Sequence, residues 1–195
     1  YILIGHSMGS FMARKYACIY GDELDGVIFL GTGNQPKSVV NAGLKLAHMA
    51  KLVHGDRYRS RLINKLMFGT YNKRIKDNRT DSDWLTKDTA IVDKYTADPK
   101  CSYMFTANGY IGFLNVIRFD INEKNIARTP AALPVLFASG EEDPVGDYGK
   151  AVKKVFKLYT KYVDNVELRL YEDDRHELHS ETNRQEVFED LLEWI

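Results

Sequence analysis

A serine pentapeptide between an apolar run and an amphipathic stretch constrains the fold of this chain more than any other feature. Residues 5–9 read Gly-His-Ser-Met-Gly, and the preceding residues 1–5 are apolar with no polar lead-in. The apolar run predicts a fully buried strand of the parallel kind. Apolar side chains then recur at helical spacing over residues 7–20. We therefore predict a strand, a tight turn and a helix in direct succession.

Strand and helix signals alternate on both sides of a long helical block. A second buried strand is predicted at residues 24–31, further strands at residues 133–138 and 166–171, and further helices at residues 148–162 and 184–195. Two strands joined by a helix make a right-handed parallel crossover. The alternation therefore predicts an α/β fold with a mostly parallel sheet and helices on both faces. We assign residues 1–36 and 129–195 to this core.

The intervening residues 37–128 predict a helical cap inserted between two strands of the core. Apolar residues there follow a helical period near residues 39–52, 62–67 and 110–117, and strand alternation is missing. Another helix is predicted to contain Trp84 and Tyr95, with Asp83 as its N-cap.

Composition and charge exclude several classes of partner. The chain has 195 residues with 27 Lys and Arg against 27 Asp and Glu, so no net field favours nucleic acid or an anionic membrane. Its two cysteines, Cys18 and Cys101, lie far apart and are expected to be free thiols. No apolar run approaches the roughly 20 residues of a membrane-spanning helix, and we expect a cytoplasmic protein.

Ser7 is the candidate nucleophile, because a Gly-x-Ser-x-Gly motif between a buried strand and a helix places its serine in a sharp turn. A strained turn lifts the hydroxyl clear of the sheet, and the two glycines allow a close approach that any side chain would block. The N–H of Met8, at the helix N-terminus, then faces the place where an oxyanion would form. The alternative is a capping serine in an ordinary tight turn.

Asp143 is the candidate acid, because it follows the strand at residues 133–138 and so lies at that strand's carboxyl end. Glu142 and Asp147 are near enough to compete. The alternative is an acidic loop that caps the helix starting near Tyr148.

His176 is the candidate base, because a short polar loop carries it after the last strand. His179 follows the same strand and is the second candidate, although a surface position suits it better. His6 belongs to the serine turn and is expected to be structural. His48 and His54 lie in the cap, where no spacing resembles a metal site.

Three motifs together resemble the lysophospholipase and monoacylglycerol-lipase-like branch of the α/β-hydrolases. They are residues 5–9, residues 140–145 (Gly-Glu-Glu-Asp-Pro-Val) and residues 174–177 (Asp-Arg-His-Glu). Residues 83–86, and the stretch from residues 95–99 through Cys101 to residues 105–106, also resemble the cap of bacterial members. The resemblance spans nearly the whole chain and implies Ser7 as nucleophile, Asp143 as acid and His176 as base.

The chain differs from that family in what precedes the serine strand. Family members have about four strands ahead of the serine strand, with a loop that gives the second oxyanion N–H. We therefore expect residues 1–5 to form a bare apolar edge, covered either by an N-terminal half or by another chain in a homo-oligomer. Because one lost oxyanion donor costs roughly a hundredfold in turnover, residues 1–195 alone are expected to show little activity.

The function that these residues predict is hydrolysis of a carboxylic ester through an acyl-enzyme, with no cofactor or metal. A lysophospholipid, a monoacylglycerol or a similar small ester would be the substrate. The cap's large apolar residues either line an acyl site or form the cap's own packing core; they are Met49, Leu66, Met67, Phe68, Tyr103, Phe105, Tyr110, Phe113 and Leu114. The rival functions are amide or carbon–carbon bond hydrolysis by the same triad, and an inactive or partner-dependent module.

Overall fold

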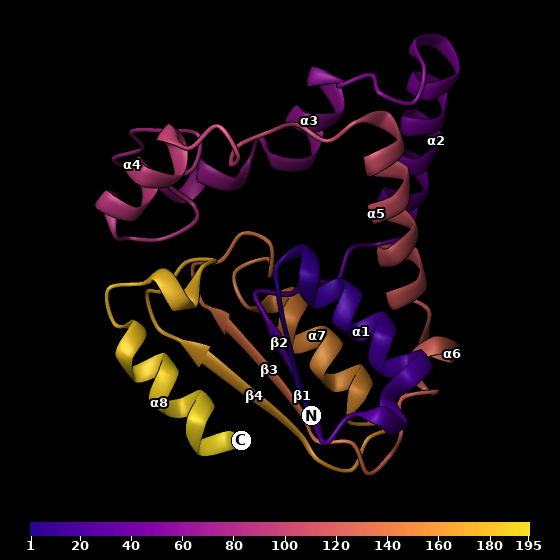
Figure 1. Ribbon diagram of the computed structural model, residues 1–195, viewed down its shortest axis with the longest axis vertical. Helices are drawn as coiled ribbons and strands as arrows, with labels where there is room; N and C mark the ends of the chain where they lie inside the picture. The colour runs from indigo at the N-terminus through magenta and orange to yellow at the C-terminus, as the bar shows by residue number, and fades with distance from the viewer.

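A single parallel sheet forms the centre of the computed structural model, which describes all 195 residues (Figure 1). Its strands are β1 (Ile2–His6), β2 (Gly26–Leu30), β3 (Val135–Gly140) and β4 (Val166–Tyr171), in that order across the sheet. All neighbouring strands are parallel, with Ile28 of β2 opposite Leu136 of β3. The predicted parallel sheet is therefore confirmed, and all its carboxyl ends share one edge.

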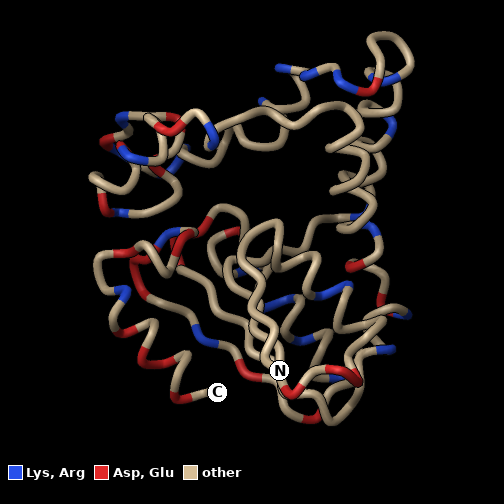
Figure 2. The backbone as a smooth tube through the Cα atoms, in the orientation of Figure 1, with Lys and Arg blue, Asp and Glu red and all other residues tan.

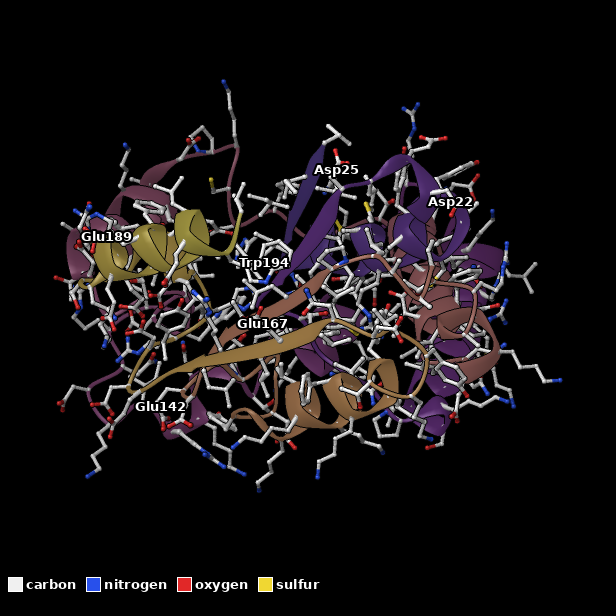
Figure 3. All side chains as sticks on the ribbon, turned by 90° about the horizontal axis from the view of Figure 1, so that it is seen from below. Asp22, Asp25, Glu142, Glu167, Glu189 and Trp194 are labelled. Carbon is white, nitrogen blue, oxygen red and sulfur yellow. The ribbon has the colours of Figure 1, made fainter.

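Helices cover both faces of the sheet, as predicted. The helices α1 (Met8–Tyr20) and α7 (Lys150–Tyr159) lie on one face and α8 (Arg184–Trp194) lies on the other. Figure 3, seen from below, shows α7 and α8 on opposite sides of β4. Successive side chains of a strand point to opposite faces. Accordingly, Phe29 of β2 packs in the cluster with α1 and α7, whereas Ile28 packs in the cluster with α8.

The first strand lies at the edge of the sheet and pairs only with β2. The prediction of a fully buried strand is wrong in this respect, because only Gly5 of β1 is buried and Ile4 is 47% exposed. An apolar run specifies a strand, but its burial depends on which neighbours the sheet gives it. The expected apolar edge at residues 1–5 is present in the structure.

The chain between β2 and β3 is helical, and we call it the helical segment. It forms α2 (Lys37–His54), α3 (Arg61–Phe68), α4 (Thr89–Ala97), α5 (Ala107–Asp120) and the short α6 (Glu123–Ile126). Helices α2 and α5 lie side by side around buried Leu44, Tyr110 and Leu114. In Figure 1, α3 and α4 extend over the edge where the strands end. None of the helices combines the length and the apolar character needed to cross a membrane.

The helix expected to begin at Trp84 begins later, and its cap is a different residue. Asp88, not Asp83, is the N-cap of α4, and its carboxylate accepts the N–H groups of Ala90 and Ile91. The carboxylate of Asp83 instead accepts bonds within its own turn, from Thr80 among others. Both residues are aspartates before an apolar stretch, so composition alone cannot tell the cap from the turn residue.

Charged residues lie outside the central strands. Figure 2 shows both signs spread over the outer helices and loops. Strands β1, β2 and β3 contain no Asp, Glu, Lys or Arg, whereas β4 carries Glu167 and Arg169. The two cysteines are free thiols, with Cys18 buried in α1 and Cys101 half-buried.

Candidate active site

Ser7 occupies a strained turn between β1 and α1. Its backbone has φ 53° and ψ −122°, a left-handed conformation that a residue with a Cβ rarely adopts. Its N–H donates to the carbonyl oxygen of Leu30 at 3.0 Å, which ties the turn to the end of β2. The sharp turn predicted from the pentapeptide is thus observed. It places the hydroxyl beyond the carboxyl ends of the strands.

Only the first glycine of the pentapeptide is required by close packing. A Cβ on Gly5 would lie 2.5 Å from the Gly9 carbonyl oxygen and 2.7 Å from Cβ of Ala13. A Cβ on Gly9 would meet no atom within 4 Å. The expectation that any side chain would be blocked at both glycines is therefore wrong for Gly9. The reason is that β1 approaches the first turn of α1 at Gly5, whereas the Cα of Gly9 faces open space.

Asp143 lies in the loop after β3 and is fully buried. Its carboxylate accepts the Val145 N–H at 2.8 Å and the Ser139 hydroxyl at 3.3 Å. The rival carboxylates do not reach this position: Glu142 and Asp147 are both exposed, and Figure 3 shows Glu142 at the periphery of the molecule. The structure therefore brings only Asp143 to the histidine.

His176 joins the serine and the acid. Its Nδ1 lies 3.0 Å from both carboxylate oxygens of Asp143, and its Nε2 lies 2.7 Å from Oγ of Ser7. The imidazole is 1% exposed, so water scarcely competes for these contacts. With Nδ1 donating to Asp143, Nε2 is free to accept the serine proton. This arrangement can generate a serine nucleophile near neutral pH.

Two glycines at strand ends, neither of them predicted from the sequence as a site residue, make room for the histidine. A Cβ on Gly140 would lie 2.1 Å from the carbonyl oxygen of Asp174, and one on Gly31 would lie 3.0 Å from the His176 ring. Gly31 also has φ +56°, which glycine adopts without strain. The sequence does hint at both, because each glycine lies at the carboxyl end of a predicted strand that leads into the site.

The remaining histidines do not contact Ser7. His6 packs against the rings of His176 and His179, each at 4.8 Å, and its Nε2 lies 3.2 Å from the His176 carbonyl oxygen. Burial, with repulsion from these two imidazoles, lowers the pKa of His6 to about 3. His6 is therefore neutral at pH 7, and its contacts with His176 and His179 support the loop after β4. His48 and His54 are exposed on α2.

An aromatic residue of the helical segment, Trp84, packs against the histidine, and Tyr71 packs against Trp84. The ring of Trp84 is 4.9 Å from that of His176 and 4.8 Å from that of Tyr71. Burial, with the charge of Asp143, raises the pKa of Tyr71, so its hydroxyl stays protonated. Neither residue was proposed from the sequence. Trp84 was expected inside a helix, and Tyr71 lies beside a polar stretch with no recognisable pattern.

A cavity of about 1000 Å³ opens over these residues. Most of its lining is hydrophobic, and Ser7, Met8 and His176 are part of it. The N–H of Met8 begins α1 and has no acceptor within that helix, so it can donate to a bound oxyanion. Most of the apolar residues expected at an acyl site line the cavity: Leu66, Met67, Phe68, Tyr103, Phe105, Phe113 and Leu114.

Two residues of that expected apolar set lie elsewhere. Met49 is 59% exposed on α2, on the outside of the helical segment. Tyr110 is fully buried and donates its hydroxyl hydrogen to Oδ1 of Asn64 at 2.9 Å. Tyr110 therefore fits the packing alternative, whereas Met49 fits neither alternative because it is exposed. Helical periodicity does not tell which side of a helix meets the cavity.

The chain is similar to known hydrolases over its whole length. The sequence model of the family described as serine aminopeptidase, S33, matches residues 1–183. Monoacylglycerol lipase of Mycolicibacterium smegmatis is 24% identical over 197 residues, which cover 100% of this chain and 61% of the lipase.

Solved structures of esterases and lipases have the same fold. A thermostable carboxyl esterase from Bacillus coagulans, in complex with glycerol, superposes with a TM-score of 0.91 at 26% identity, covering 100% of this chain and 63% of the esterase. A soluble variant of monoglyceride lipase from Saccharomyces cerevisiae gives 0.74 at 22% identity, covering 99% and 60%. The α/β-hydrolase fold is therefore confirmed, and the chain spans less than two thirds of the length of these relatives.

Proposed function

The chain belongs to the serine aminopeptidase S33 family of hydrolases, and we propose that it hydrolyses a carboxylic ester through an acyl-enzyme formed on Ser7. The proposal rests on one observation above all. A hydrogen-bonded chain runs from Asp143 through His176 to Ser7, with 3.0 Å at the first link and 2.7 Å at the second. The lipase and esterase names of the relatives support the ester as the bond cleaved.

In the proposed cycle, His176 takes the Ser7 proton as the hydroxyl oxygen attacks the ester carbonyl carbon. The Met8 N–H donates to the oxyanion that forms, and Asp143 stabilises the imidazolium. His176 then gives the proton to the leaving alcohol. In the second half, the same imidazole takes a proton from water as the water oxygen attacks the acyl-enzyme carbonyl carbon. His176 then gives that proton to Oγ of Ser7 as the C–O bond breaks, which releases the acid and restores the free serine.

We further propose that residues 37–128 act as a cap that selects the substrate. The cavity over Ser7 is lined largely by apolar side chains of α2, α3 and α5, with Val39, Leu66 and Phe113 among them. Such a lining suits the acyl chain of a monoacylglycerol, a lysophospholipid or a similar ester, because its burial removes apolar surface from water.

Amide hydrolysis is the second candidate function. The family description names an aminopeptidase, and two carboxylates, Asp147 and Glu177, line the same cavity. A carboxylate is the group that would hold the free ammonium of an aminoacyl substrate. The two functions therefore differ in the occupant of one cavity and share the same serine chemistry.

Labelling of Ser7 by a fluorophosphonate tests the proposed nucleophile. We expect one adduct on intact protein, its loss in Ser7→Ala, and its retention in the control Ser38→Ala, whose side chain is exposed on α2. The low turnover of p-nitrophenyl esters expected for residues 1–195 should fall to the uncatalysed rate in Ser7→Ala and stay unchanged in Ser38→Ala. An intact protein that takes no label would contradict the proposal and favour a partner-dependent module.

A substrate panel separates the two candidate bonds. We expect p-nitrophenyl esters of increasing acyl length to be cleaved, with kcat/KM rising as the chain fills the apolar cavity. Aminoacyl-anilides are expected to be cleaved far more slowly. Turnover of the anilides alone would reject the esterase and support the aminopeptidase.

A further inference from the structure

The loop that carries His176 is hydrogen-bonded to a short stretch of the helical segment. We call residues 172–182 the histidine loop and residues 83–87, just before α4, the strap. The strap carbonyls of Trp84 and Leu85 accept the N–H groups of His176 at 3.4 Å and Glu177 at 2.7 Å. The hydroxyl of Thr86 donates to the carbonyl oxygen of Ser180 at 3.0 Å. The strap and the loop therefore share main-chain bonds at the histidine and at the residue after it.

Glu181 lies at the centre of this contact as a fully buried carboxylate. It accepts the N–H of Lys87 from the strap at 3.1 and 3.2 Å, and the N–H of Arg175 from the loop at 2.8 Å. The N–H of Thr182 adds a bond at 3.3 Å. No Lys or Arg side chain pairs with it within 4.0 Å, so backbone donors alone compensate its burial.

Charged side chains on either side of the carboxylate extend the same contact. The guanidinium of Arg175 donates to the strap carbonyls of Asp83 at 2.7 Å and Thr86 at 3.1 Å. The ammonium of Lys87 bonds the buried carboxylate of Asp174 at 2.9 Å. The two residues immediately before His176 are thus both held by the strap.

We propose that Glu181 is a positioning residue that clamps the strap to the histidine loop and so holds His176 between Ser7 and Asp143. The expected effect on kcat rests on the proposed function. The expected effect on the His176–Asp143 bond does not depend on it. Misplacing a reacting group by about 1 Å can cost roughly a hundredfold in rate. Without its bonds to the strap, the histidine loop could shift by such a distance and carry His176 with it.

The test is Glu181→Gln in the full chain, with Thr106→Ala as a matched control. Gln keeps the size of the side chain but brings an NH₂ group against N–H donors. Thr106 caps α5 by accepting the Gly109 N–H at 3.1 Å and is not part of the strap or the loop, so its loss destabilises the helical segment only. We expect kcat for a p-nitrophenyl ester to fall about 10- to 100-fold in Glu181→Gln, with KM within about twofold of the parent. Thr106→Ala should keep both constants.

A second readout does not depend on turnover. The Nδ1 proton of His176, held by Asp143, should give a low-field proton NMR signal in the parent and in Thr106→Ala, and that signal should broaden or shift in Glu181→Gln. Thr86→Val removes the hydroxyl bond to Ser180, together with the bond that this oxygen accepts from the Asp88 N–H at 3.1 Å, and leaves the buried carboxylate in place. It should weaken kcat about 2- to 10-fold in the same direction, and it replaces Glu181→Gln if that variant does not fold.

The outcomes separate the two proposals. A Glu181→Gln or Thr86→Val protein with parental kcat and an unchanged His176 signal overturns the positioning role. An unreactive parent whose His176 signal still depends on Glu181 rejects the esterase and leaves the clamp supported. A kcat loss equal to that of Thr106→Ala also overturns the proposal, because general destabilisation would then explain it.

Discussion

At the scale of single residues, the geometry of the serine turn depends on one close contact and one strained backbone. Ser7 holds φ 53°, and the neighbouring strand passes the helix at a distance that only Gly5 permits. The second glycine of the same motif has free space around it. The pentapeptide therefore contains one sterically required glycine and one that the packing of this chain does not require.

This difference predicts opposite effects for two similar substitutions. Gly5→Ala should lower the free energy of unfolding by about 1 to 3 kcal/mol, because its methyl group overlaps the Gly9 carbonyl. Gly9→Ala should leave it unchanged or raise it by up to about 1 kcal/mol, because alanine favours the α1 helix. Urea unfolding midpoints measure both, and equal losses in the two variants would contradict the steric argument.

At the scale of elements, the helical segment shows how a local cap fixes where a helix begins. Helix α4 starts at Thr89 because Asp88 satisfies its first free N–H groups. The preceding strap forms turns and bends instead of helix, so its carbonyl groups stay free to bond the histidine loop. A helix beginning at Trp84, as expected from periodicity, would have used these carbonyls internally. The cap residue Asp88 thus marks the boundary between the strap, which holds the histidine loop, and the helix α4.

The N-cap assignment predicts a stability loss specific to Asp88. Asp88→Ala should lower the free energy of unfolding by about 1 kcal/mol, whereas Asp88→Asn should keep most of it, because asparagine caps equally well. The 3.5 Å contact of Asp88 with Arg184 is partly exposed and contributes little. Thermal unfolding of the two variants is the measurement. A loss of the same size in Asp88→Asn would assign the effect to charge rather than to capping.

At the scale of the whole molecule, a buried pair joins the sheet layer to the helical segment. The Arg14 guanidinium, on α1, donates to the carbonyl oxygens of Gly33 at 2.9 Å and Asp120 at 3.1 Å. The Asp120 carboxylate, at the end of α5, is 1% exposed and has no hydrogen-bond donor. Burial raises its pKa to about 7, against the attraction of Arg14 and Lys15.

The raised pKa of Asp120 predicts a pH-dependent stability. Because the folded chain holds this proton more tightly than the unfolded chain, the stabilisation present below about pH 4 is lost as pH rises through about 7. Asp120→Asn does not titrate, so its stability relative to the parent should rise by roughly 2 to 4 kcal/mol between pH 4 and pH 8. Thermal unfolding across this range measures the difference, with Asp22→Asn, exposed in Figure 3, as control. Parallel curves for Asp120→Asn and the parent would refute it.

The sequence by itself determined the local units of this protein. An apolar run ahead of Gly5 and a helical period after Ser7 predicted the strand, the turn and the helix, and the same signals located β2, β3 and β4. Asp143 and His176 were chosen by their order after strands, and the structure brings both to Ser7. These features follow from backbone propensity and side-chain period, which neighbouring residues carry.

Tertiary structure alone decided which distant segments meet. The edge position of β1, the strap over the histidine loop and the buried carboxylate of Glu181 all depend on contacts between residues far apart in the chain; Glu181 and Lys87 are separated by 94 positions. A glutamate in a polar stretch resembles any surface residue until the fold surrounds it with N–H donors. Burial and pairing are properties of the folded chain, and no local period records them.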